Sequence, residues 1–114
     1  MPRYLIHFNQ QWVGDHPAEW YEERGTLARA VVRDMQDQGV LVFADGLEED
    51  IEQAVGADAT SGTLMFTEGP VSPETEFVGG LTIVDVANDE AAREWAGRIA
   101  VACGWPQEMR RFKS

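Results

Sequence analysis

Apolar and polar side chains alternate along the first part of the chain. Residues 3–9 read RYLIHFN, with Tyr4, Ile6 and Phe8 on one face and Leu5 and His7 on the other. A period of two among branched and aromatic residues predicts a β-strand. Further strands are predicted at 40–44, 81–86 and 107–112. The run at 40–44, VLVFA, is apolar throughout, so we expect it to be buried on both faces.

Two longer segments have the spacing of amphipathic helices. The first runs from Pro17 to Gln38, with apolar residues at Trp20, Leu27, Ala28, Val31 and Met35. Pro17 suits a first helical turn, and Gly39 suits a C-terminal cap. The second helix begins after Asn88, whose side chain can cap the first turn, and it stops at Gly104.

Between these helices the chain predicts a hairpin. Residues 51–57 and 63–67 flank a polar loop at 58–62. The order of elements is therefore β-α-β-β-β-α-β. It predicts an α+β fold, a ferredoxin-like sandwich with a mostly antiparallel sheet and both helices on one face. At 114 residues the chain is expected to be a single domain, residues 1–114.

This architecture leaves one face of the sheet without helices. Several of the predicted strands are apolar on both faces, and two helices can cover only one. A second copy of the chain, stacked on the uncovered face, would hide this apolar surface. We therefore predict a homodimer.

Charge narrows the range of partners. The chain has 20 acidic and 9 basic residues and a formal net charge of -11. Every Lys and Arg lies in 1–33 or 93–114, so the stretch 34–92 carries acidic side chains alone. Nucleic acid is therefore not expected as a partner. The acidic stretch is interpreted as a solvated surface, with a site for a metal ion or a basic protein as the alternative.

Several classes of site and location are not indicated. No apolar run reaches the length of a membrane helix and the first residues do not resemble a signal peptide, so we expect a cytoplasmic protein that avoids membranes. The single Cys103 has no partner for a disulfide or a zinc site. The acidic segment 45–50 lacks the alternation of an EF-hand loop, and no phosphate loop or dinucleotide motif is present. We expect no metal and no cofactor.

A set of short motifs in fixed order gives the chain a family resemblance. Residues 67–71 read TEGPV, Gly79-Gly80 and IVDV at 83–86 follow, and NDEAAREWA and EMR come later. In this order and spacing the chain resembles the YCII-related proteins of the branch named for a DGPF motif. The resemblance covers nearly the whole chain and implies a dimeric α+β barrel. We interpret the glycines and Pro70 as mainly architectural, serving a turn and a bulge or close backbone approach.

The chain departs from this pattern at several positions. Glu68 stands where the branch has Asp, Val71 where it has Phe, and the loop 73–76 lacks a usual lysine. In the better-known YCII-like branch, a His near the first helix and an Asp after the second helix form a suspected catalytic dyad. The corresponding positions here fall on Ala28 and near Ile99. The resemblance therefore implies no such dyad in this chain.

The polar residues of the predicted strands supply the candidate site. His7 is the best general acid/base candidate because its charge is tunable near neutral pH, although a structural role is the alternative. Asp85 and Glu68 are candidates for orienting His7, and Glu68 is expected beside a dimer cavity with the following loop as a lid. Arg110 is expected to hold an anionic group of a ligand, unless it forms a structural ion pair. Trp20 can line a pocket or belong to the core.

Three functions fit these observations. The favoured one is a homodimer that binds a small organic molecule in a cavity over the sheet. The second is a cofactor-independent lyase or isomerase that uses His7 for proton transfer, because the superfamily includes such enzymes. The third is a regulatory interaction module linked to transcription, because members of the family occur beside sigma factors. Whether the protein is an enzyme stays open at this point.

Overall fold

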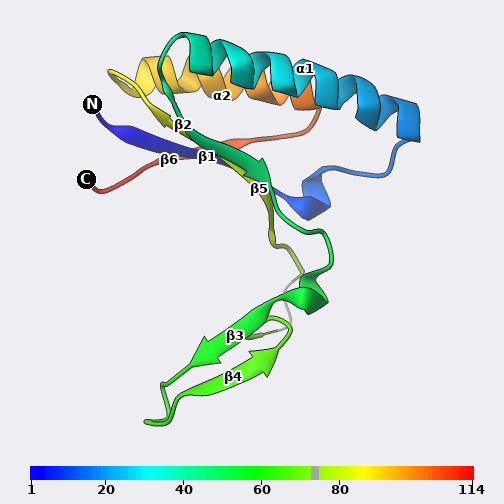
Figure 1. Ribbon diagram of the computed structural model, residues 1–114, viewed down its shortest axis with the longest axis vertical. Helices are drawn as coiled ribbons and strands as arrows, with labels where there is room; N and C mark the ends of the chain where they lie inside the picture. Colours follow the sequence, from blue (N-terminus) through cyan, green and yellow to red (C-terminus); the bar gives the residue numbers. More distant parts are fainter. Residues whose placement is uncertain (73–74) are drawn as a thin grey trace.

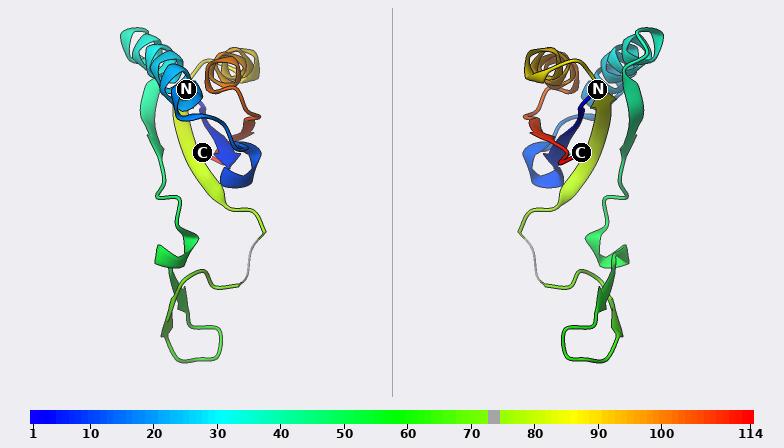
Figure 2. Two further views of the ribbon diagram at one scale, coloured as in Figure 1. Left: turned by 90° about the vertical axis from the view of Figure 1, so that its right-hand side faces the viewer. Right: turned by 90° about the vertical axis from the view of Figure 1, so that its left-hand side faces the viewer.

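The fold is a four-stranded antiparallel sheet with two helices on one face. The computed structural model describes residues 1–72 and 75–114 (Figure 1). The sheet has the order β2-β5-β1-β6, and its strands are β1 (Arg3–Asn9), β2 (Leu41–Gly46), β5 (Val78–Asp85) and β6 (Glu108–Arg111). Figure 2 shows α1 (Ala18–Asp37) and α2 (Asp89–Cys103) side by side on the same side of the sheet. The predicted ferredoxin-like α+β fold is confirmed.

The core lies between the helices and the sheet. Its fully buried side chains come from both layers: Tyr4, Ile6, Met35 and Val84. Trp95 of α2 packs in the same cluster. The Tyr4 hydroxyl donates a hydrogen bond to Asp89 at the start of α2, and this bond raises the pKa of the tyrosine. The capping role predicted for Asn88 is confirmed, since its side chain accepts a hydrogen bond from the Ala91 N–H at 2.9 Å.

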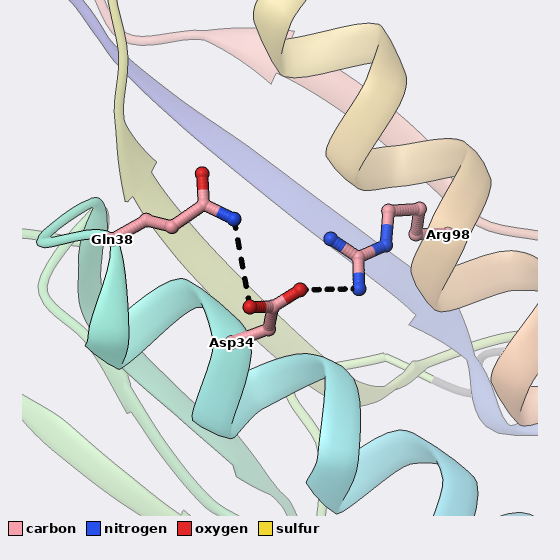
Figure 3. Close-up of polar contacts among 3 residues, drawn as sticks. All are labelled: Asp34, Gln38 and Arg98. Carbon is pink, nitrogen blue, oxygen red and sulfur yellow. Dashed lines mark hydrogen bonds and ion pairs between the residues drawn. The ribbon is translucent and has the colours of Figure 1, made fainter.

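A polar contact joins the two helices on their outer side. Arg98 of α2 donates to Asp34 of α1 at 2.6 Å, and Gln38 donates to the other carboxylate oxygen at 3.5 Å (Figure 3). The guanidinium of Arg98 also lies over the Trp95 ring, 4.6 Å from its centroid. These hydrogen bonds, led by that of Arg98, lower the pKa of Asp34.

We expect Asp34→Asn to lower the melting temperature at pH 7, with the difference from the wild type shrinking in acid. The folded-state pKa of Asp34 is below its ordinary value of 3.8. The ionised carboxylate therefore stabilises the fold above pH 3.8, and this stabilisation is lost as the pH falls through the folded-state pKa. Asp37→Asn, on the same helix, controls for the loss of one negative charge. Equal melting temperatures of the two variants at pH 7 would contradict the prediction.

The edge strand β2 departs from the sequence-based expectation. The run at 40–44 was expected to be buried on both faces, and this is wrong for the single chain. Phe43 is 52% exposed and Val42 is exposed as well. The physical reason is that β2 lies at the edge of the sheet and the helices cover only one of its faces.

The predicted hairpin forms, but outside the main sheet. Its strands β3 (Val55–Asp58) and β4 (Met65–Glu68) pair only with each other, and together with their loop we call residues 55–68 the arm. The start of the predicted first strand is instead a short 3-10 helix, Ile51–Gln53. The arm projects away from the sheet (Figures 1 and 2). The radius of gyration is accordingly 16.2 Å, compared with about 13 Å for a compact chain of this length.

The glycines of the family motif have the structural roles predicted for them. Gly69 has φ of +90°, and its N–H donates to the Ala54 carbonyl at 2.6 Å, which closes the base of the arm. Phe8 pairs with Gly80 and Asn9 pairs with Val78, so Gly79 is the extra residue of a β-bulge. The loop departure at Pro73 and Glu74 lies outside the described residues.

Candidate functional site

The sheet face opposite the helices carries the predicted polar residues. Because Tyr4 and Ile6 point into the core, their neighbours Leu5 and His7 point to the other side. Cross-strand pairing assigns further residues to this side, which we call the open face: Phe43, Leu81, Ile83, Asp85, Glu108 and Arg110. The open face therefore combines an apolar centre with charged side chains.

His7 is held in a sheltered position on the open face. Its side chain is 14% exposed, and Nε2 lies 3.7 Å from Oε2 of Glu108 on the neighbouring strand. The Trp12 ring lies beside it, with the ring centroids 6.0 Å apart. The other ring nitrogen, Nδ1, is buried and has no hydrogen-bond partner within residues 1–72 and 75–114. An imidazole between a carboxylate and an unfilled position can exchange a proton with a bound molecule.

Asp85 is paired with Arg3 and the N-terminal amine, away from His7. Its carboxylate lies 3.6 Å from Nε of Arg3 and 3.8 Å from the N-terminal amine. The sheet register pairs Arg3 with Asp85 and His7 with Leu81, so the two positions are four residues, or roughly 13 Å, apart along the strands. Glu108 occupies the position expected for Asp85. The sequence feature that could have indicated Glu108 as a site residue is the Glu-x-Arg spacing, which places Glu108 and Arg110 on the same face of a strand.

The three expected ligand-binding residues lie in three different places. Arg110 is on the open face opposite Leu5, and the two help to line a recess of about 250 Å³. Glu68 ends the arm, which projects away from the sheet of its own chain (Figure 1). Trp20 lies in α1, where its ring stacks on His16 at 3.7 Å and its centroid is 6.0 Å from that of Trp105. Trp20 thus belongs to an aromatic cluster off the open face.

A second recess lies on the helix-covered side. It measures about 460 Å³, is bounded by α1, β2 and β5, and we call it the α1 groove. Ala28 and Ile99, the positions compared above with the dyad of related proteins, both line it. The groove is therefore apolar at these two positions. Cys103 also lines it, and burial raises the pKa of its thiol to about 11, so the thiol is neutral at pH 7.

Residues 1–72 and 75–114 contain neither a metal-binding cluster nor a membrane-spanning helix. Among the described residues no three side chains of His, Cys, Asp or Glu gather as a metal site would require. Within the same residues, no helix is both long and apolar enough to cross a membrane.

Comparison with known proteins places the chain in a family. No curated protein matches the sequence. The sequence model of the YCII-related domain, in contrast, matches residues 12–103, which is most of the chain and includes both helices and the arm. The resemblance drawn from the motifs is confirmed at the level of the family. This chain belongs to the YCII-related domain family.

Proposed function

We propose that the protein is a homodimer that binds a small organic molecule in a cavity enclosed over the open face, around His7. The observation that carries this proposal is the buried Nδ1 of His7, which has no hydrogen-bond partner among the described residues and lies on the sheet face opposite α1 and α2. A buried polar atom without a partner is costly, so it indicates a missing hydrogen-bonding group. A ligand held over this face supplies that group.

The exposed apolar side chains of the open face support self-association. Phe43 and Phe112 are exposed there, and Leu5, Leu81 and Ile83 are only partly covered. A recess of about 570 Å³ between Val42, Ile83 and Phe112 continues this surface. A second copy related by a two-fold axis brings two such surfaces together and removes both from water.

The arm supports the same partner. Its large exposed apolar side chains are Val55, Leu64, Met65 and Phe66, and a two-stranded hairpin is marginally stable by itself. The charged side chains of the arm and of the residues that flank it are all acidic. The basic side chains of the sheet lie on β1, on the edge strand β6 and just after it: Arg3, Arg110, Arg111 and Lys113. An acidic arm and a basic sheet edge on the same chain are complementary between two copies. The arm of one protomer thus packs on the sheet layer of its partner.

Proton transfer is the second candidate function, favoured by the His7–Glu108 pair. A carboxylate 3.7 Å from Nε2 stabilises the imidazolium that forms when Nδ1 accepts a proton from a bound molecule. Arg110 lies on the same face, where it can hold a carboxylate of that molecule. In this case the protein is a cofactor-independent lyase or isomerase.

Native mass spectrometry of the purified protein tests the binding proposal. We expect a dimer with an added mass that denaturation releases, and we expect His7→Ala to lose this mass. His16→Ala, which replaces the histidine beside Trp20, is the matched control and should retain it. A monomer, or a His7→Ala dimer that retains the same molecule, would contradict the proposal. A dimer without added mass that also shows no His7-dependent binding of carboxylate-bearing aromatic fragments would contradict it as well.

A further inference from the structure

The α1 groove holds polar side chains that have no partners. Thr82 of β5 lines the groove and is only 7% exposed, and its hydroxyl makes no hydrogen bond to any described residue. Gln107 lines the same groove, and its Nε2 is buried and likewise unpartnered within the described chain. Buried polar groups are normally hydrogen-bonded. The buried Gln107 amide in this recess is an exception, and it indicates that the recess is completed by another molecule.

Two arginines border the same groove. Arg29 and Arg33 lie one turn apart on α1, and in the part of the chain described neither forms an ion pair. Arg29 has only a long hydrogen bond of 3.4 Å to the Thr26 hydroxyl. Two unpaired guanidinium groups together are unexpected in a chain with a net charge of -11. Asp45 is the one carboxylate in the lining, and it already accepts a hydrogen bond from the Gly46 N–H at 2.8 Å.

Apart from Gln36 of α1, the remaining lining is mostly apolar. Phe8, Val32 and Ile99 contribute to it, together with Ala28 and Ala44. The volume of about 460 Å³ falls in the range of small-molecule sites, which combine apolar walls with a few polar groups. The neutral Cys103 thiol adds no negative charge to this lining.

We propose that the α1 groove binds a small carboxylic acid with an apolar body. The carboxylate lies between Arg29 and Arg33, which can donate to it in bidentate fashion. The apolar body packs against Val32 and Ile99, and the Thr82 hydroxyl and Gln107 amide donate to a second acceptor. Except for Leu81, the residues that line the groove are not among those named for the open face, and His7 does not line the groove, so this site is distinct from the proposed open-face cavity.

Titration of the isotope-labelled protein with 2-naphthoate, followed by amide NMR shifts, tests the groove. We expect shifts in α1, β2 and β5, and binding at least about tenfold tighter than that of neutral 2-naphthamide. Arg33→Gln should weaken naphthoate binding about tenfold, whereas Arg93→Gln, on α2 and outside the groove, should leave it unchanged. Equal binding of the acid and the amide would overturn the proposal. Shifts confined to β1 and β6 would also overturn it while leaving the open-face site standing.

Thr82→Val provides a second readout that does not depend on arginine. Because the hydroxyl has no hydrogen-bond partner among the described residues, the isosteric variant should melt at the same or a higher temperature than the wild type. The rise in melting temperature caused by 2-naphthoate should be smaller in Thr82→Val. A variant that melts lower when free, or that shows the full naphthoate-induced rise, would contradict the assignment of Thr82.

Discussion

Replacing Phe43 with Asp is expected to convert the protein from a dimer to a monomer at micromolar concentration. Phe43 is 52% exposed in the single chain, so the change should leave the fold of the protomer intact. In the proposed dimer, the variant places a carboxylate from each protomer into the apolar centre of the interface. Desolvating an unpaired charge costs several kcal/mol, so we expect the dissociation constant to rise at least about a hundredfold. Analytical ultracentrifugation measures this shift.

Val101→Asp is the matched control for this experiment. Val101 lies on α2, on the helix side of the molecule, and is 76% exposed. The same change of an apolar side chain to a carboxylate should leave the dimer unaffected there. A wild-type monomer, or dimers in both variants, would show that the open face is not the interface. Dissociation by Val101→Asp alone would place the interface on the helices.

Gly80→Ala is expected to lower the free energy of unfolding by about 1–3 kcal/mol, the usual cost of overpacking. A Cβ at this position would lie 2.7 Å from Cε1 and 2.9 Å from Cζ of Phe8. The Phe8 ring would have to move, and it packs edge-on against Trp105 at 5.1 Å between centroids. Chemical denaturation of the two proteins measures the difference.

Gly97→Ala and a double variant control for this result. Gly97 lies in α2 with open space where a Cβ would be placed, so alanine there should raise the free energy of unfolding by about 0.5–1 kcal/mol. Phe8→Leu should recover part of the loss when combined with Gly80→Ala, because the two residues contact each other. If Gly80→Ala stabilises the protein as Gly97→Ala does, the Phe8 ring does not exclude a side chain at position 80.

The polar residues of the open face show which features a local sequence pattern can predict and which it cannot. Alternation in residues 3–9 was enough to place His7 on the face opposite Tyr4 and Ile6, and the structure agrees. The partner of His7 was not predictable in this way, because it depends on which residue of a distant strand pairs opposite it. The observed register brings Glu108 to His7 and Arg3 to Asp85. A shift of strand register would change both pairs without changing any local pattern.

The α1 groove shows the same limit for buried polar groups. Thr82 lies in a strand segment, LTIVDV, whose pattern predicts only a strand. Its hydroxyl has no hydrogen-bond partner in the described part of the chain, because α1 packs across β2 and β5 and leaves a recess above it. Arg29 and Arg33 are one helical turn apart in the sequence, but only the tertiary structure shows that both border this recess.

The sequence by itself determined the two helices, the Asn88 cap and most of the strands, because hydrophobic period and capping chemistry act between residues that are close along the chain. It also determined that one sheet face lacks helices, since two helices cannot cover both. Only the tertiary structure decided that β2 lies at an exposed edge, that the hairpin leaves the sheet as an arm, and that Glu108 meets His7. These features depend on strand order and register, which arise from contacts between residues distant in sequence.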